Sequence, residues 1–178
     1  AFNILTELYR PLNAHIIFTS IKNSELIKYV SNAFLATKIS FINEIANICG
    51  EIGADVKEIA STVGMDKRIG KAFFDSGLGY GGSCLPKDVQ ALIHLAKSKN
   101  VEPKILSAVD QTNKIQVDRF ADRMIKLLKK NRAKSVSVLG LAFKPMTDDM
   151  RDAPSLKIIS KLTDNGFEVK AFDPAVSK

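Results

Sequence analysis

The chain has little cysteine and no long apolar run, and both absences exclude classes of protein. Its two cysteines are Cys49, within a helical pattern, and Cys84, after a run of glycines, so a disulfide framework is not indicated. No apolar stretch is long enough to cross a bilayer, and no basic-then-apolar leader is present. We therefore expect a cytoplasmic protein without a membrane partner, long enough to bury a core in one or two domains.

A usable dinucleotide-binding turn is also missing. Such a turn reads Gly-x-Gly-x-x-Gly between a strand and the helix that it opens. The one match, residues 77–82, has no strand before it and opens no helix at the required offset. The chain therefore lacks the signature of a dinucleotide-binding domain.

Positive charge is in excess, with a formal net charge of +7. Five basic residues surround the end of one predicted helix: Lys126, Lys129, Lys130, Arg132 and Lys134. Such a cluster is typical of a nucleic-acid surface, but it also complements the negative end of a helix. No nucleic-acid motif and no interleaved aromatic residue accompany it, so we expect no nucleic-acid partner. A basic balance also suits an enzyme whose ligands carry diphosphates.

The most informative segment is GLGYGGSCLPKD at residues 77–88. Its glycines let the backbone approach a ligand closely, and Pro86 marks the first turn of a helix. Cys84 then lies at a helix N-terminus, where unpaired N–H groups and the helix dipole stabilise a thiolate. Lys87 adds positive charge, and Asp88 can orient water or accept a proton. The segment predicts a cysteine nucleophile, the alternative being a glycine turn with a small buried thiol.

Lys28 and Asn32 are four residues apart and therefore share one face of a predicted helix. The neighbouring Tyr29 and Val30 imply that Lys28 is partly buried. An ammonium and an amide one turn apart can stabilise an oxygen that acquires negative charge. The alternative is a lysine extended along the surface and an asparagine at a helix contact.

Apolar periodicity and capping residues predict a helical middle for the chain. Ser24 is expected to cap a helix that Gly53 ends, and Asp55 to cap a short helix that Gly64 ends. Residues 65–83 read as a loop unusually long for a compact domain and therefore functional. Two further helices are predicted, at residues 86–99 and 103–130.

Both ends of the chain carry strand signals. Strand 135–141, helix 154–165 and strand 168–172 form one predicted βαβ unit, and parallel strands normally belong to a larger sheet. Near the other end, a helix-like stretch precedes an apolar strand at residues 16–18. The predicted fold is α/β overall, with a central all-α domain of long helices followed by the first βαβ unit of a Rossmann-like domain.

Three separated motifs resemble the UDP-glucose/GDP-mannose dehydrogenase family, and its UDP-glucose 6-dehydrogenase branch in particular. GYGGSCLPKD at residues 79–88 is similar to the active-site loop of that family. SELIKYVSNAFLATK at residues 24–38 resembles its helix with a catalytic lysine and asparagine. VLGLAFKP at residues 138–145 and TDDMRDAPS at residues 147–155 resemble the opening of its nucleotide-sugar domain.

The resemblance implies an NAD-dependent, two-step oxidation of UDP-glucose at C6 to UDP-glucuronate, through a thiohemiacetal and a thioester on Cys84. Lys28 and Asn32 would stabilise the oxyanion at C6, and Asp88 would orient water. Arg68 would reach the sugar in a neighbouring subunit. Substrate contacts are carried over to Arg68, Phe73, Phe74, Gly81, Phe143 and Lys144, and cofactor contacts to Lys87 and Arg151; no metal site is expected.

Alternatives stay open at this point. GDP-mannose dehydrogenases share the GGSCLPKD core, although Tyr80 and the run NAFLATK from Asn32 favour UDP-glucose. The chain could also be a non-enzymatic dimerisation module with an inert Cys84, or a domain whose glycine loop binds phosphate. By resemblance, a homodimer is expected through the long helix at residues 103–130.

The resemblance also predicts the domain limits. Residues 1–22 are expected to be the last helix and strand of an N-terminal NAD-binding domain that is otherwise missing. Residues 23–131 would form the central dimerisation and catalytic domain, and residues 132–178 the start of a UDP-sugar-binding domain. The chain is thus expected to be the middle of a longer enzyme and inactive alone.

Overall fold

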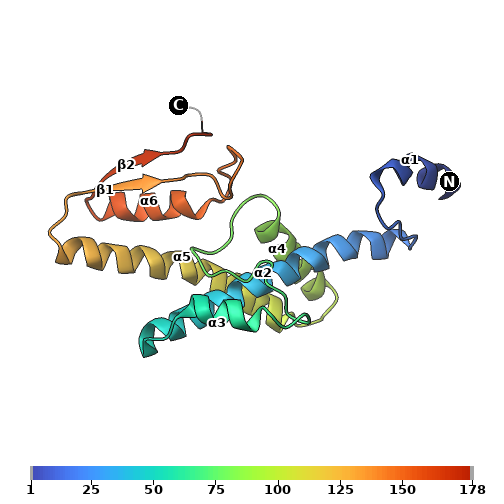
Figure 1. Cartoon of the computed structure of the whole chain (residues 1–178), viewed down its shortest axis with the longest axis horizontal. Helices are drawn as coiled ribbons and strands as arrows, with labels where there is room; N and C mark the ends of the chain where they lie inside the picture. Colours follow the sequence, from blue (N-terminus) through green and yellow to red (C-terminus); the bar gives the residue numbers. More distant parts are fainter. Residues whose placement is uncertain (1, 177–178) are drawn as a thin grey trace.

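Two long helices, α2 (Ile21–Ile52) and α5 (Lys104–Lys130), form the frame of the computed structural model, which describes residues 2–176 (Figure 1). The other elements are α1 (Phe2–Tyr9), η1 (Arg10–Leu12), α3 (Val56–Val63), α4 (Leu85–Ser98), β1 (Ser135–Leu139), α6 (Pro154–Asp164) and β2 (Glu168–Phe172). Helix α4 packs against both long helices, and the unit of β1, α6 and β2 lies along α5 (Figure 1). The predicted class, a helical middle followed by a βαβ unit, is confirmed.

Helix α2 begins one turn earlier than the sequence suggested. The Ser20 hydroxyl accepts a hydrogen bond from the Asn23 amide at 3.2 Å, so Ser20 is the N-cap. The prediction of Ser24 is wrong, because residues 21–23 already take helical geometry and the Ser24 amide donates to the Ser20 carbonyl at 2.9 Å. At the other end, Gly53 at a φ of 73° confirms the predicted C-cap.

The helical core is built where small residues of α2 let the other helices approach. Ala33 and Ala36 are buried and lie in one cluster with Val89 of α4 and Val109 of α5. Close packing of this kind makes the relative positions of the three helices sensitive to added volume. Polar side chains at the contact of α2 with α4 and α5 are therefore held in fixed positions.

A second apolar cluster joins the βαβ unit to the C-terminal half of α5. It consists of Val117, Ala121, Ile125, Ile158, Leu162 and Phe167. Lys161 of α6 adds ion pairs to Asp118 at 2.9 Å and to Asp122 at 3.0 Å on α5. The βαβ unit is therefore seated on the long helix by apolar contact and by charge.

The sheet has two parallel strands, with Ser135 opposite Glu168 and Leu139 opposite Phe172. Strand β1 ends at Leu139, two residues before the predicted end. Gly140 turns the chain at a φ of 92°. The Asp173 carboxylate then accepts hydrogen bonds from the amides of Leu141 at 2.7 Å and Ala142 at 3.1 Å, so these amides do not continue the ladder.

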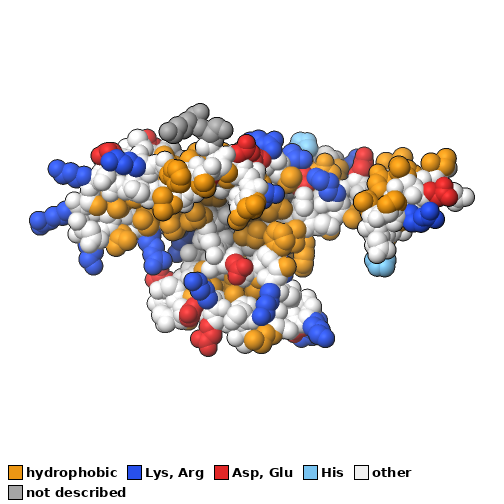
Figure 2. All heavy atoms as spheres, turned by 45° about the horizontal axis from the view of Figure 1, so that its top comes forward, with side chains coloured by type: hydrophobic (Ala, Val, Ile, Leu, Met, Phe, Trp, Pro, Cys, Tyr) orange, Lys and Arg blue, Asp and Glu red, His pale blue; other side chains and the backbone are white. Residues whose placement is uncertain are grey.

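The prediction of a strand at residues 16–18 is wrong. This stretch takes no regular structure in the described chain, because β1 and β2 pair with each other and no other strand lies beside it. Apolar side chains gather on the projecting segment that contains α1 (Figure 2), among them Phe2, Ile4, Leu5 and Leu8. Within residues 2–176, no helix combines the length and hydrophobicity that a bilayer span requires.

Candidate active site

A buried carboxylate, Asp88, lies at the centre of the candidate site. Its side chain is completely buried, and its Oδ2 accepts hydrogen bonds from Lys28 Nζ at 2.7 Å and from Asn32 Nδ2 at 2.6 Å. Lys87 Nζ lies 3.0 Å from the other carboxylate oxygen. The predicted shared face of Lys28 and Asn32 on α2 therefore meets the first turn of α4.

The protonation states of this cluster follow from its hydrogen bonds. Burial raises the pKa of Asp88, but the donors on Lys28, Asn32 and Lys87 outweigh it, so the pKa lies below its usual range. The hydrogen bond to Asp88 raises the pKa of Lys28. Both groups are therefore charged at neutral pH. The expectation that Lys28 is partly buried is wrong, since its side chain is 57% exposed although its ammonium reaches Asp88.

Cys84 is exposed and immediately precedes α4, as its N-cap residue. Its Sγ lies 3.8 Å from Ser83 Oγ, and its carbonyl accepts the Asp88 amide at 2.9 Å. The alternative of a buried, inert thiol does not fit this exposure. The sulfur also contributes to the raised pKa of Lys28, after the larger effects of Asp88, and it contributes similarly to Arg151. Thiol and cationic groups therefore share one electrostatic environment.

The βαβ unit closes against the glycines of the Cys84 loop. The Gly82 amide donates to the Arg151 carbonyl at 2.9 Å. A Cβ on Gly82 would lie 2.6 Å from the Phe143 ring, and one on Gly81 would overlap the Asp152 carbonyl oxygen. Only glycine permits this approach of two backbones.

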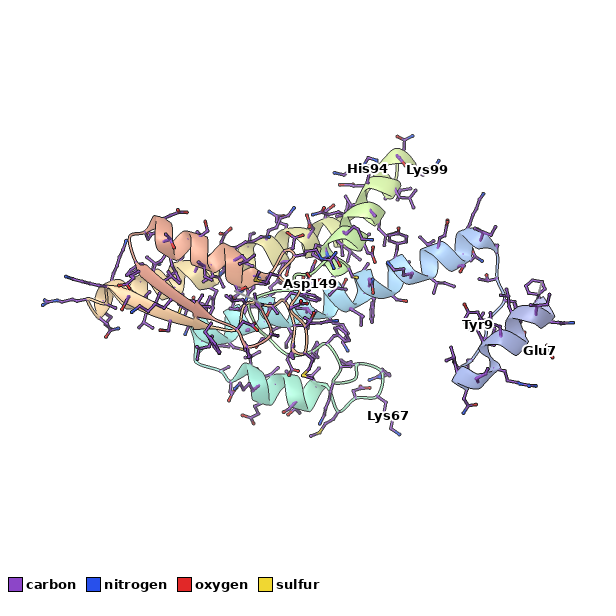
Figure 3. The ribbon with its side chains drawn as sticks, turned by 90° about the horizontal axis from the view of Figure 1, so that it is seen from above. Glu7, Tyr9, Lys67, His94, Lys99 and Asp149 are labelled. Carbon is purple, nitrogen blue, oxygen red and sulfur yellow. The ribbon has the colours of Figure 1, made fainter. Side chains whose placement is uncertain are left out.

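Charged residues of the βαβ unit reach the same region. Arg151 pairs with Asp149 at 2.7 Å and, with the largest contribution, lowers the pKa of that carboxyl to about 2. Figure 3 shows Asp149 beside the N-terminal end of α4, with His94 and Lys99 toward the opposite end of that helix. Lys144 is exposed, and its ammonium lies 5.2 Å from the Phe143 ring centroid.

Three further predicted substrate residues, Arg68, Phe73 and Phe74, lie in the loop between α3 and α4. Arg68 is 88% exposed and pairs with Asp66 at 2.6 Å, and Figure 3 shows neighbouring Lys67 at the edge of the molecule, away from Asp149. Phe74 is buried and Phe73 is exposed with a φ of 59°. A groove of about 350 Å³ is lined by Phe34, Thr37, Lys38, Phe41, Val63, Arg68, Ile69 and Phe74.

Lys38 of α2 fixes the chain between Arg68 and Phe74. Its ammonium donates to the carbonyls of Ile69 at 3.0 Å, Gly70 at 3.1 Å and Ala72 at 2.5 Å. Sequence reasoning did not single out Lys38, because its backbone partners lie in a loop with no repeating pattern. One helix therefore holds both the Asp88 cluster and the Arg68 loop.

Amide side chains on the long helices were also missed. Asn43 of α2 and Gln116 of α5 are buried, and both bind Gly77; Asn113 of α5 binds Tyr80. The available signal was polar residues at positions 113 and 116 of a helix whose pattern is otherwise apolar on the inward face.

For a dinucleotide, residues 2–176 offer cationic groups but no glycine-rich turn between a strand and a helix. Lys87 and Arg151 are exposed beside the Asp88 cluster and carry donors suited to phosphate oxygens. The glycines of residues 77–82 follow no strand, and their backbone is bound by side chains of this chain. Lys87 and Arg151 therefore suit contacts to the phosphates at one side of a bound dinucleotide, and the rest of such a site is not formed by these residues.

Comparison with known proteins identifies two regions of the chain. Residues 22–115 match the UDP-glucose/GDP-mannose dehydrogenase family, central domain, and residues 137–178 match the UDP binding domain of the same family.

Individual relatives match nearly the whole chain. UDP-glucose 6-dehydrogenase TuaD of Bacillus subtilis is 50% identical over 96% of the chain and 37% of its own length. UDP-glucose 6-dehydrogenase of Rickettsia bellii is 48% identical over 97% of the chain and 41% of its own length. A solved UDP-glucose dehydrogenase from Pyrobaculum islandicum superposes with a TM-score of 0.89 at 38% identity, covering 98% of this chain and 40% of that one. The chain thus spans about two fifths of the length of these relatives.

Proposed function

This chain belongs to the UDP-glucose/GDP-mannose dehydrogenase family, and from that premise we propose that it carries the nucleophile of an NAD-dependent dehydrogenase acting on C6 of UDP-glucose. One observation carries the proposal. An exposed cysteine at the N-terminus of α4 lies one helical turn from a buried carboxylate that binds two ammonium groups and an amide. Acyl chemistry on a thiol needs these parts, a nucleophile and donors for the developing oxyanion.

The proposed reaction oxidises a primary alcohol twice. In the first step, C6 loses a hydride and a proton and becomes an aldehyde. When bound, NAD supplies the hydride acceptor, one molecule for this hydride and a second for the later one, while the proton from the alcohol passes to water. The Cys84 thiolate then adds to the aldehyde carbon, and the carbonyl oxygen becomes an alkoxide.

Lys28 and Asn32 are the proposed donors to that oxygen. An ammonium has three N–H groups, and Asp88 accepts one of those on Lys28, so others are free for a ligand. Loss of the second hydride leaves a thioester. Water then adds to the thioester with Asp88 as the orienting carboxylate, the C–S bond breaks, and the thiolate returns as the carboxylate product forms.

UDP-glucose is preferred to GDP-mannose as the proposed substrate. The two relatives described above are named UDP-glucose 6-dehydrogenase and share about half of their aligned residues with the chain. Phe143 and Lys144 lie in the region that matches a UDP binding domain. They are proposed to contact the sugar nucleotide, together with Gly81.

A homodimer is also proposed, with its contact on α2. Apolar residues at seven- and four-residue spacing, Phe34, Phe41, Ile48 and Ile52, form an exposed stripe on this helix. The family resemblance implied a contact on the helix at residues 103–130 instead. On α5, fewer large apolar residues are exposed, and they do not follow one stripe: Ile105, Ile115 and Leu127. Phe41 and Arg68 line the same groove, so a copy seated on this stripe would meet the Arg68 loop.

Product analysis with full-length enzyme containing this chain tests the proposal. We expect two NADH for each UDP-glucuronate formed, and a mass adduct of the sugar nucleotide on Cys84 after acid quenching. Cys84→Ala should abolish the carboxylate product, whereas Cys49→Ala, at the buried cysteine, should retain it. Carboxylate formation by Cys84→Ala, or faster turnover of GDP-mannose, would contradict the proposal. The 178-residue chain alone should form no NADH, because it has no dinucleotide-binding turn.

A further inference from the structure

The loop that leads to Cys84 has no regular secondary structure, yet side chains bind its backbone at defined points. The Gly77 amide donates to Asn43 Oδ1 at 2.7 Å, and the Gly77 carbonyl accepts from Gln116 Nε2 at 2.8 Å. The Tyr80 amide donates to Asn113 Oδ1 at 2.8 Å, and the Tyr80 carbonyl accepts from Asn113 Nδ2 at 2.9 Å. Both backbone groups of two loop residues are thus satisfied by side-chain amides.

These amides are themselves held in place. Gln116 is buried, and its Oε1 accepts a hydrogen bond from Asn47 Nδ2 at 2.9 Å, so its amide orientation is fixed by α2. Asn113 lies one turn earlier on the same face of α5. A Cβ on Gly79 would lie 2.7 Å from Asn113 Oδ1, so the loop backbone is pressed against this side chain.

We propose that Asn113 and Gln116 of α5 are positioning residues that hold the Cys84 loop in register with the Asp88 cluster on α2 and α4. The inference rests on the proposed function of Cys84. Neither residue touches the thiol; each acts through the backbone of residues 77–80. Because a displacement of about 1 Å can cost roughly 100-fold in rate, fixing this loop matters for capture of the aldehyde by Cys84.

The consequence for the reaction is a change in partition between two products. If the loop loosens, the first oxidation continues, but the aldehyde leaves before the thiolate adds to it. One hydride and one proton have then been removed, and the aldehyde is released in place of the carboxylate. A purely structural role would lower both products in parallel.

The test is Asn113→Leu, which keeps the size of the side chain and removes both hydrogen bonds to Tyr80. Asn131→Leu is the matched control, because Asn131 is the C-cap residue of α5 and its side-chain amide donates to the Leu127 carbonyl at 2.8 Å, away from the Cys84 loop. Two readouts are measured. The first is amide hydrogen exchange of residues 77–84 in the chain; the second is the ratio of aldehyde, trapped with a hydrazine, to carboxylate in the full-length enzyme.

We expect exchange in residues 77–84 to rise by about tenfold in Asn113→Leu and to stay unchanged in Asn131→Leu. The aldehyde fraction should rise while KM for UDP-glucose changes little. Unchanged exchange, or faster exchange with an unchanged product ratio, would overturn the positioning role. If wild-type enzyme makes neither product, the proposed function fails, and the exchange result alone still decides whether Asn113 holds the loop.

A second variant guards against a failure to fold. Alkylation of buried Cys49 reports global unfolding. If Asn113→Leu exposes Cys49, it is replaced by Gln116→Met, which removes the bond to the Gly77 carbonyl and the bond from Asn47 Nδ2 but keeps both bonds between Asn113 and Tyr80. Exposure of Cys49 in both variants would show that the amides hold the core and not the loop, and the proposal would be wrong.

Discussion

Gly82 is one of two neighbouring glycines at which the helical middle and the βαβ unit approach each other closely. Its φ of 80° lies in the left-handed region, and its missing side chain leaves room for the Phe143 ring. Two separate requirements therefore apply at this position: a left-handed backbone conformation and space for the Phe143 ring. Either would favour glycine, and together they connect the Cys84 loop to the unit that matches a UDP binding domain.

Gly82→Ala should destabilise the chain by about 1–3 kcal/mol, since its methyl group would overlap the Phe143 ring and its φ is unfavourable for alanine. Phe143→Ala in the same chain should recover part of this loss, a coupling of about 0.5–2 kcal/mol in a double-mutant cycle by urea unfolding. Gly77→Ala is the control, because a Cβ there meets nothing within 4 Å. Additive effects of the two substitutions would contradict the contact.

Asp88→Asn should lower the free energy of unfolding at pH 7 by about 2 kcal/mol, because two ammonium groups and an amide lose a charged acceptor. The folded-state pKa of Asp88 is lowered, so the carboxylate stabilises the chain above its unfolded pKa. That stabilisation is lost as the pH falls through the folded-state pKa. The difference between the thermal melts of wild type and variant should therefore shrink as the pH falls below the ordinary pKa of an aspartate, about 4.

Asp164→Asn provides the comparison for the Asp88 melts, since Asp164 is exposed at the end of α6 and makes only a 3.5 Å contact with Ser160. It should change the melting temperature little at any pH. A constant difference between wild type and Asp88→Asn down to pH 2 would contradict the ion-paired carboxylate.

A residue of the site could be predicted from the sequence where the residues that it acts with lie close to it in the chain. Lys28 and Asn32 share a helix face by spacing, and Asp88 follows the cysteine motif, so the candidates were available from the sequence. Their hydrogen bonds to one carboxylate were not, because residues 56 and 60 positions apart meet only through the packing of α2 on α4. Asn113 and Lys38 escaped notice because backbone groups in irregular loops are their partners.

At the scale of elements, capping decided the main difference between expectation and structure. Ser20 and Ser24 are both followed by residues that can be helical, and the serine hydroxyl suits either position. The longer helix forms because residues 21–23 add a turn at little cost in intrinsic propensity. Helix ends at Gly53 and the βαβ order were predictable, since glycine and alternating apolar runs act locally. The absence of a strand at residues 16–18 could not be predicted locally, because a strand forms only where a second strand is available to hydrogen-bond with it.

Ser20→Ala should destabilise the start of α2, whereas Ser24→Ala should have little effect. Loss of an N-cap costs about 1 kcal/mol, and exchange of the first-turn amides, including that of Asn23, should rise about fivefold. Ser24 lies inside the helix, so its replacement by alanine is neutral or slightly stabilising there. The reverse order of effects in hydrogen exchange would restore Ser24 as the cap.

At the scale of the molecule, the stripe on α2 consists of four exposed large apolar side chains, at residues 34, 41, 48 and 52. Phe41→Glu should convert a proposed dimer to a monomer in analytical ultracentrifugation, because a charge in the middle of the stripe must then be buried without a partner. Ile115→Glu, on the exposed face of α5, should leave the dimer intact. Dissociation by the α5 substitution alone would place the contact on the helix that the family resemblance implied.

Helix α2 also has a consequence for how this chain can vary. Lys28, which binds Asp88, and Lys38, which holds the Arg68 loop, are separated by ten residues, about 15 Å along the axis. A single inserted residue between them would turn one lysine by about 100° relative to the other and would disconnect one of the two loops. Point substitutions can accumulate on the exposed faces of this helix, but its length between these two lysines cannot change by one residue. The number of residues between Lys28 and Lys38 sets the spacing and relative orientation of the two loops. It is therefore as strongly constrained as the identity of the two lysines themselves.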